Sequence, residues 1–162
     1  MQGAVHPIQG PWAGQLAILA RPRGNDWLTD EVRAWREAGI DVVVSLLTGP
    51  ENIELGLTEE PTIAHNLGLS FVSFPIADYS VPESQESVLR VAHELTKLLS
   101  KGKFVGIHCR QSVGRSGLMA ACLLVTAGEN AAEALKHVSS GRGVSVPDTG
   151  EQRNWVFTLA KT

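Results

Sequence analysis

The sequence predicts an α/β fold, with a mostly parallel central sheet of four to five strands flanked by helices. Short apolar segments alternate with longer segments whose apolar residues recur at helical intervals, a pattern typical of parallel sheets. Residues 41–47 read Asp-Val-Val-Val-Ser-Leu-Leu, a near-continuous apolar run that indicates a strand covered on both faces. With 162 residues, 43% of them hydrophobic, the chain is long enough for one core, so we expect residues 1–162 to form a single domain.

The first half of the chain is expected to contribute three strands and two helices. A strand runs from Trp12 through Ala20 and ends in a loop at residues 21–26. The hydroxyl of Thr29 can cap the helix that follows, and Gly39 can end that helix in a left-handed conformation. The remaining expected elements are a strand at 41–47, a loop at 48–55, a helix at 59–66 and a strand at 69–74.

The second half is expected to contribute one strand and four helices. Ser80 and Glu83 have capping-box spacing, so a long helix should follow them and end near residues 101–102. Asn130 is expected to cap a later helix, and Thr149 with Gln152 has the same capping-box spacing before the last one. The other expected elements are a loop at 75–82, a strand at 103–108, a buried helix at 118–127 and a helix at 131–139.

Charge and composition argue against several classes of partner. Fourteen basic and seventeen acidic residues give a formal charge of −3, so the chain lacks the positive field of a general nucleic-acid or anionic-membrane binder. The apolar run at 118–125 is too short to cross a bilayer, and residues 1–6 lack the features of a targeting segment. Neither cysteine belongs to a CxxC pair. We therefore expect a cytoplasmic protein with reduced thiols, no nucleic-acid or membrane partner, and no metal or other cofactor.

Residues 108–117 carry the most informative motif, His-Cys-Arg-Gln-Ser-Val-Gly-Arg-Ser-Gly, between the last expected strand and the buried helix. In a strand–loop–helix turn of this kind, backbone N–H groups point inward and the helix N-terminus adds partial positive charge. Such a loop can hold a phosphate. The candidate phosphate-binding residues are Arg110, Gln111, Ser112, Val113, Gly114 and Arg115.

Cys109 lies at the base of this loop and is the candidate nucleophile. The loop amides, the helix N-terminus and Arg115 would all stabilise a negatively charged sulfur, and a thiolate is a ready nucleophile at neutral pH. The planar guanidinium of Arg115 can hold two phosphoryl oxygens and follow them into the transition state. The hydroxyl of Ser116 is close enough to hydrogen-bond the sulfur as it leaves. This combination predicts attack on a phosphate ester.

The motif His-Cys-x5-Arg-Ser-Gly resembles the signature of the protein tyrosine phosphatase superfamily, and it stands whole at residues 108–117. The opening at 12–17, the strand at 42–47, the loop around Asp78 and the tail at 142–155 are similar to the small atypical dual-specificity phosphatases. The resemblance therefore covers nearly the whole chain. It implies a protein tyrosine phosphatase-like fold and a phosphocysteine intermediate.

The resemblance also assigns roles outside the loop. Asp78 matches the aspartate that serves as general acid and then as base, although a plain turn residue remains the alternative. His108 matches a histidine that supports the cysteine loop through hydrogen bonds. Gln152 resembles a glutamine that orients the hydrolytic water, and it is also a capping residue. Asp148 is less suited to acid catalysis, because it lies after the loop and near a helix cap.

The expected substrate is a phosphoprotein or phosphopeptide, with phosphotyrosine and aryl phosphates preferred and phosphoserine or phosphothreonine possible. Arg110 is the single added base within the loop, whereas similar inositol-lipid phosphatases place lysines there. Tyr79, Arg142 and Arg153 are candidates for the pocket mouth, or else for surface packing. The alternatives are a phosphoinositide or RNA 5′-phosphatase, a non-catalytic phosphate-binding module and a thiol-redox protein.

Cys122, in the apolar helix, is expected to pack in the core, with reversible pairing to an oxidised Cys109 as a further hypothesis.

Overall fold

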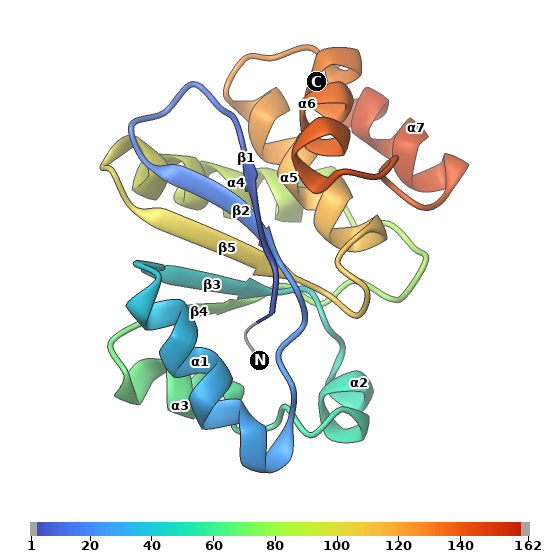
Figure 1. Ribbon diagram of the computed structural model, residues 1–162. Helices are drawn as coiled ribbons and strands as arrows, with labels where there is room; N and C mark the ends of the chain where they lie inside the picture. Colours follow the sequence, from blue (N-terminus) through green and yellow to red (C-terminus); the bar gives the residue numbers. More distant parts are fainter. Residues whose placement is uncertain (1–2, 160–162) are drawn as a thin grey trace.

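A computed structural model describes residues 3–159 and shows one five-stranded sheet (Figure 1). The strand order is β1-β2-β5-β3-β4, with β1 antiparallel to β2 and the other pairs parallel. The predicted mostly parallel α/β fold is therefore confirmed. The strands are β1 (Val5–Ile8), β2 (Gln15–Leu19), β3 (Val42–Ser45), β4 (Ser70–Ser73) and β5 (Phe104–His108).

Helices cover both faces of the sheet, as Figure 1 shows. α1 and α3 pack together on one face, while α4, α5, α6 and α7 lie on the other, with α5 against β2 and β5. α2 lies near the carboxyl ends of the parallel strands. No helix within residues 3–159 is long and apolar enough to span a membrane. The helices are α1 (Leu28–Glu37), α2 (Gly49–Glu54), α3 (Glu60–Asn66), α4 (Gln85–Ser100), α5 (Gly114–Thr126), α6 (Ala131–Arg142) and α7 (Gly150–Leu159), with a 3-10 turn at Asn25–Trp27 before α1.

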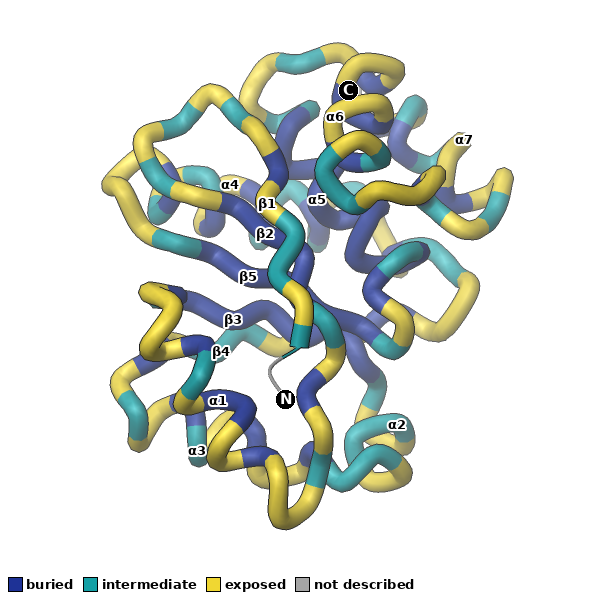
Figure 2. The backbone as a smooth tube through the Cα atoms, in the orientation of Figure 1, coloured by how far each residue is buried: buried dark blue, intermediate teal, exposed yellow. Residues whose placement is uncertain are grey.

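Side-chain alternation along the central strands divides the core into two parts. Val42 and Val44 of β3 pack on the α5 side of the sheet, and Val43 packs on the side of α1 and α3. β3 and β5 are interior strands that pair on both edges, and their backbones are buried, as Figure 2 shows. Burial on both faces explains their nearly continuous apolar sequences. The carboxyl end of β5 is consequently held by a neighbour on each side.

One prediction for the first half was wrong, and one strand had not been predicted. The loop expected at 48–55 contains α2, because Thr48 and Glu51 form a capping box and Pro50 is tolerated in the first turn of a helix. β1 (Val5–Ile8) was not predicted, and its sequence Val-His-Pro-Ile is short and contains a proline, which is unfavourable within a sheet. Pro7 is accommodated because β1 lies at the sheet edge.

Several helix starts also differ from expectation. α1 begins at Leu28 without a side-chain cap, so Thr29 does not cap it. Ser84, not Ser80, caps α4 by accepting a hydrogen bond from the Ser87 N–H. α5 begins at Gly114, four residues before the apolar run from which it was predicted. The caps at Asn130 and at Thr149 with Gln152 are confirmed by their hydrogen bonds.

Candidate active site

The motif loop lies at the carboxyl end of β5 and leads directly into α5. Cys109, 2% exposed, is at its base. Ser112 has a left-handed backbone with φ 57°, and its hydroxyl donates to the Leu19 carbonyl oxygen of β2. The Nε of Arg142, at the end of α6, donates to the Ser112 carbonyl oxygen at 2.8 Å. The loop is thus tied to the sheet at one point and to α6 at another.

The first turn of α5 closes the loop. Gly114, Arg115 and Ser116 are buried there, and the helix N-terminus contributes partial positive charge beside Cys109. The Ser116 hydroxyl has no hydrogen-bond partner among residues 3–159. A buried hydroxyl without a protein partner has a free donor and acceptor.

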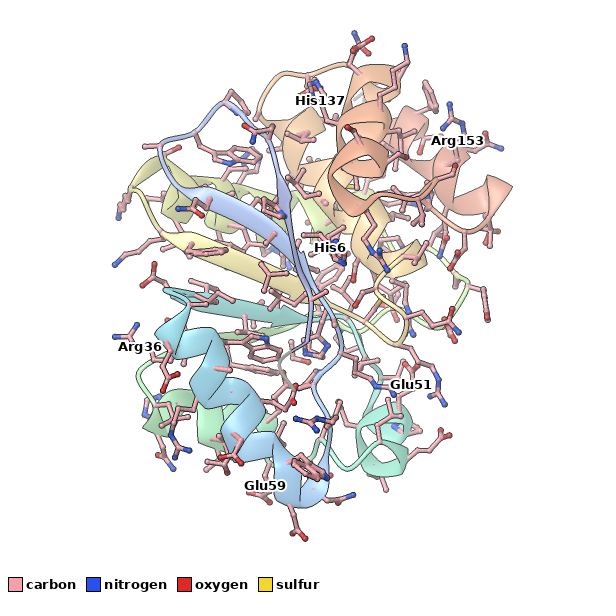
Figure 3. The ribbon with its side chains drawn as sticks, viewed as in Figure 1. His6, Arg36, Glu51, Glu59, His137 and Arg153 are labelled. Carbon is pink, nitrogen blue, oxygen red and sulfur yellow. The ribbon has the colours of Figure 1, made fainter. Side chains whose placement is uncertain are left out.

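Arg115 is buried to 99%, and its guanidinium is held mainly by Glu51 of α2. Nη1 donates to Glu51 Oε1 at 2.7 Å and to the Ile76 carbonyl oxygen at 2.8 Å, and Nη2 donates to Glu51 Oε2 at 2.9 Å. The Arg115 hydrogen bond lowers the pKa of Glu51 to about 2. Burial alone would lower the pKa of Arg115, but Glu51 and the nearby Cys109 and Asp78 raise it. Figure 3 shows Glu51 reaching from α2 toward the motif loop.

Asp78 is brought to the same guanidinium from the loop after β4. Its Oδ1 lies 3.1 Å from Arg115 Nη2 and also accepts the Tyr79 N–H at 3.0 Å. The Asp78 side chain is 41% exposed, so it stands at the rim of the site. Tyr79 is 58% exposed beside it, with a left-handed backbone. A carboxyl group at the rim can reach a leaving group that the buried loop cannot.

Gln152, on α7, connects the motif loop to the loop that carries Asp78. Its Nε2 donates to the Ser80 carbonyl oxygen at 3.0 Å, and its Oε1 accepts the Thr149 N–H. A Cβ at Gly114 would lie 3.1 Å from Gln152 Oε1 and 2.6 Å from Asp148 Oδ2. Both polar side chains therefore cover this glycine closely. Gln152 and Asp148 thus both lie beside the start of α5, and Asp148 is nearer to the motif loop than the sequence suggested.

The remaining loop residues face outward to different degrees. Arg110 is half-buried, and its Nη2 donates to Glu54 Oε1 at 3.0 Å, while its Nη1 lies 3.8 Å from Glu51. Gln111 is exposed and Val113 is half-buried. Of the predicted mouth residues, Arg142 contacts the loop, whereas the Arg153 guanidinium lies 5.5 Å from the centre of the Phe157 ring on α7. Figure 3 shows Arg153 on α7.

Two acidic residues near the motif were missed by sequence reasoning. Glu51 had a signal, because its spacing from Thr48 is that of a capping box, but the segment was interpreted as a loop. Glu60 had none that set it apart from neighbouring Glu59. It is fully buried, and its Oε2 lies 2.7 Å from His108 Nε2.

Cys122 is buried in α5, as predicted, and burial raises the pKa of its thiol. Both cysteines are free. In the described part of the chain, no group of three or more His, Cys, Asp or Glu residues is arranged to hold a metal ion.

Comparison with known protein families gives a match at residues 17–129 to the family described as "Polymorphic toxin system, DSP-PTPase phosphatase". Protein tyrosine phosphatase domain-containing protein 1 from Bos taurus is 29% identical over 160 residues, which cover 91% of this chain and 20% of that protein. The Danio rerio protein of the same name is 30% identical, with 91% and 22% covered. The chain spans about one fifth of the length of these relatives.

Solved structures share the fold. A kinase associated phosphatase (KAP) structure superposes with a TM-score of 0.91 at 20% identity, covering 99% of this chain and 96% of the other. Tk-PTP in its active form gives 0.78 at 26% identity, with 99% of each chain covered. PTPMT1 in complex with PI(5)P gives 0.71 at 17% identity, with 89% and 90% covered.

Proposed function

The chain belongs to the DSP-PTPase phosphatase family, and we propose that it hydrolyses phosphate monoesters through a phosphocysteine intermediate. The observation that carries this proposal is the convergence of three side chains at the start of α5. Cys109 is buried in the loop that leads into α5, the buried Arg115 is close enough to interact electrostatically with it, and Asp78 Oδ1 lies 3.1 Å from Arg115 Nη2. A phosphate-binding module needs the arginine but has no use for the thiol and the rim carboxyl group.

In the first step, the Cys109 sulfur attacks phosphorus and the bond from phosphorus to the ester oxygen breaks. Asp78, in its protonated form, gives its proton to that oxygen, so that a neutral alcohol or phenol leaves. The loop amides and Arg115 hold the phosphoryl oxygens through the transition state. The positive charge that metal ions supply in other phosphoryl transfers is supplied here by the loop and the guanidinium.

In the second step, a water molecule attacks phosphorus of the phosphocysteine. Asp78 takes one water proton, the bond from sulfur to phosphorus breaks, and sulfur leaves with the electron pair as a thiolate. The unpartnered Ser116 hydroxyl can donate to that sulfur. Gln152 has its Oε1 close to Gly114 and its Nε2 on the Ser80 carbonyl oxygen, a placement that suits a residue that orients the water.

A phosphoprotein is the substrate we favour, with phosphotyrosine preferred and phosphoserine or phosphothreonine accepted more slowly. The guanidinium of Arg110 is engaged by Glu54, and Glu51 lies near it, so this residue adds little free positive charge for a polyphosphorylated inositol. Exposed Tyr79 offers an apolar ring beside the rim carboxylate for an aryl ester. Because both cysteines are free thiols, we propose a reducing, cytoplasmic setting.

Hydrolysis of p-nitrophenyl phosphate in the presence of a chelator tests the reaction. We expect turnover by the unmodified chain and none by Cys109→Ser. A Cys122→Ser variant is the matched control and should retain activity. Parallel assays with phosphotyrosine, phosphoserine and phosphothreonine peptides, phosphoinositides and RNA 5′-phosphate rank the substrates. Preference for an inositol lipid or RNA would replace the phosphoprotein assignment, and full activity of Cys109→Ser would remove the proposed intermediate.

A further inference from the structure

β4 has an outer edge whose backbone groups pair with no other strand. It is the last strand in the sheet order and pairs only with β3 in the described part of the chain (Figure 1). The N–H groups of Ser70 and Phe74 donate to carbonyl oxygens on the β3 side, both at 2.9 Å. Backbone groups of alternate residues in a strand point to opposite edges, so the N–H and C=O groups of Phe71 and Ser73 point outward. The strand, Ser-Phe-Val-Ser, carries no charge or proline of the kind that usually blocks the addition of another strand.

A cavity of about 310 Å³ lies beside this edge, on the face of the sheet that α1 and α3 cover. Its apolar lining comes from α2, α3, the turn between them and β4, and consists of Ile53, Leu57, Pro61 and Phe71. Ile53 is 74% exposed, so its side chain has little cover from the described residues. None of the described residues that line this cavity is charged. The first cavity therefore suits an uncharged, apolar side chain.

A second cavity, of about 230 Å³, lies on the opposite face, where β4 ends and α4 begins. It is lined by Phe74, Pro75, Glu83 and Ser87. Phe74 packs on the core part on the α5 side, whereas Phe71 packs on the other part, so the two cavities lie under different faces of the strand. Glu83 is exposed and has no ion-pair partner among residues 3–159. This cavity suits a lysine or arginine, whose stem can pack on the apolar residues while its charge meets the carboxylate.

The charge of the surrounding segment indicates the kind of partner. Residues 37–89, which include β3, α2, α3, β4 and the start of α4, contain nine acidic residues and no lysine or arginine. The whole chain has a formal charge of only −3, so its basic residues lie outside this segment. A second copy that paired edge to edge at β4 would bring two acidic segments together. Charge complementarity therefore favours a basic partner over a second copy of this chain.

We propose that the outer edge of β4 binds an extended, basic segment of a partner protein as an additional strand. Phe71 and Ser73 exchange backbone hydrogen bonds with that segment, an apolar side chain enters the first cavity, and a lysine or arginine enters the second. Side chains of a strand alternate between its faces, so the two anchoring residues must lie one or three positions apart. This inference goes beyond the proposed reaction, because the segment needs no phosphate and lies outside the motif loop.

Binding of fluorescein-labelled, unphosphorylated peptides to the full chain tests the proposal. Each decapeptide consists of threonine except for one leucine and one lysine, placed one to four positions apart. We expect spacings of one and three to bind about tenfold more tightly than spacings of two and four. Amide exchange followed by NMR locates the contact. With peptide bound, the N–H groups of Phe71 and Ser73 should exchange about tenfold more slowly, and that of Val72, which faces β3, should not change.

Variants of exposed side chains test each cavity. Ile53→Ser should weaken binding of the best peptide about fivefold, with Val144→Ser as the control, because Val144 is an exposed apolar residue that lines neither cavity. Glu83→Gln should weaken binding about threefold, with Glu86→Gln, 85% exposed and outside both cavities, as the control. Glu83→Lys should reverse the preference, so that a peptide with glutamate in place of lysine binds more tightly. A defect in folding would not produce such a reversal.

Several outcomes would overturn the proposal. These are an absence of binding by every peptide at about 1 mM, equal affinities across the four spacings, or unchanged amide exchange at Phe71 and Ser73 in the complex. Dimerisation of the unmodified chain in sedimentation, abolished by Ile53→Ser, would also overturn it, because a second copy would then occupy the edge.

Peptide binding does not require turnover, so this test is independent of the proposed reaction. A chain that binds the peptides as expected but releases no p-nitrophenol contradicts the proposed function and supports this inference. A chain that hydrolyses p-nitrophenyl phosphate but binds none of the peptides does the reverse.

Discussion

The carboxylate of Glu51 occupies both terminal nitrogens of Arg115, at 2.7 and 2.9 Å. Arginine has five N–H donors, of which Glu51 accepts two. The Ile76 carbonyl oxygen accepts a third, from Nη1, and Asp78 Oδ1 lies 3.1 Å from Nη2. Of the five N–H donors of Arg115, only Nε–H has no partner within residues 3–159. A phosphoryl group that binds through Nε and Nη2 must therefore displace Asp78, while Glu51 can remain in place.

Removal of the Glu51 charge should destabilise the fold and impair the site together. Glu51→Gln leaves the buried guanidinium with only the half-exposed Asp78 as counter-charge, so we expect the free energy of unfolding to fall by about 3 kcal/mol. Glu54→Gln is the control, since this carboxylate is 65% exposed, and its loss should change stability by less than about 1 kcal/mol. Urea unfolding followed by tryptophan fluorescence measures both. If Glu51→Gln and Glu54→Gln lowered the free energy of unfolding by the same small amount, the contact of Glu51 with Arg115 would be weak.

The same pair predicts how stability depends on pH. The pKa of Glu51 is about 2 in the folded chain, below its ordinary value of 4.5. A lowered pKa stabilises the folded state fully above about pH 4.5, and this contribution disappears as the pH falls toward 2. We expect the stability difference between the unmodified chain and Glu51→Gln to be constant from pH 5 to 8 and to shrink below pH 4.5. A difference that grows on acidification would contradict the assignment.

Asp78 should have opposite effects on turnover and on phosphate affinity. Asp78→Ala removes the proton donor, so we expect kcat for p-nitrophenyl phosphate to fall by about 10²- to 10⁴-fold. It also frees Arg115 Nη2, so inorganic phosphate should inhibit residual activity at a concentration about threefold or more lower. Inhibition constants for both proteins give the comparison, with Asp148→Ala as the control on the other side of the loop. Weaker phosphate inhibition in Asp78→Ala would indicate that the carboxylate does not compete for the guanidinium.

Gly114 should tolerate no side chain. A Cβ there would meet Asp148 Oδ2 at 2.6 Å, so Gly114→Ala must displace Asp148 or the start of α5. We expect a loss of about 1–3 kcal/mol of stability, with reduced kcat/KM. At Gly150 a Cβ meets nothing within 4 Å, so Gly150→Ala is the matched control and should be neutral or slightly stabilising. Thermal unfolding and p-nitrophenyl phosphate kinetics on both variants test this prediction. A Gly114→Ala variant as stable and as active as Gly150→Ala would contradict it.

The features that the sequence predicted well are formed by residues that lie close together along the chain. β3 and β5 are nearly continuous apolar runs, and residues 108–117, between β5 and α5, hold the loop, its cysteine and its arginine within ten residues. Glu51 and Glu60 escaped notice because their significance arises only in three dimensions. Glu51 is 64 positions from Arg115, and Glu60 is 48 positions from His108. β1 was not predicted for a related reason. Proline is unfavourable within a sheet, and Pro7 is tolerated because β1 is an edge strand, a position that is set only by the three-dimensional fold.

Cys109 directly follows β5, an interior strand paired on both edges, and strands of this kind generally open only when the whole domain unfolds. Asp78 and Tyr79, by contrast, belong to an exposed connection. Substitutions along that connection can alter which ester is accepted while the reacting atom stays where it is. Among related chains, we therefore expect differences in substrate preference to arise from substitutions around Asp78 and Tyr79. The motif loop that holds Cys109 should stay unchanged.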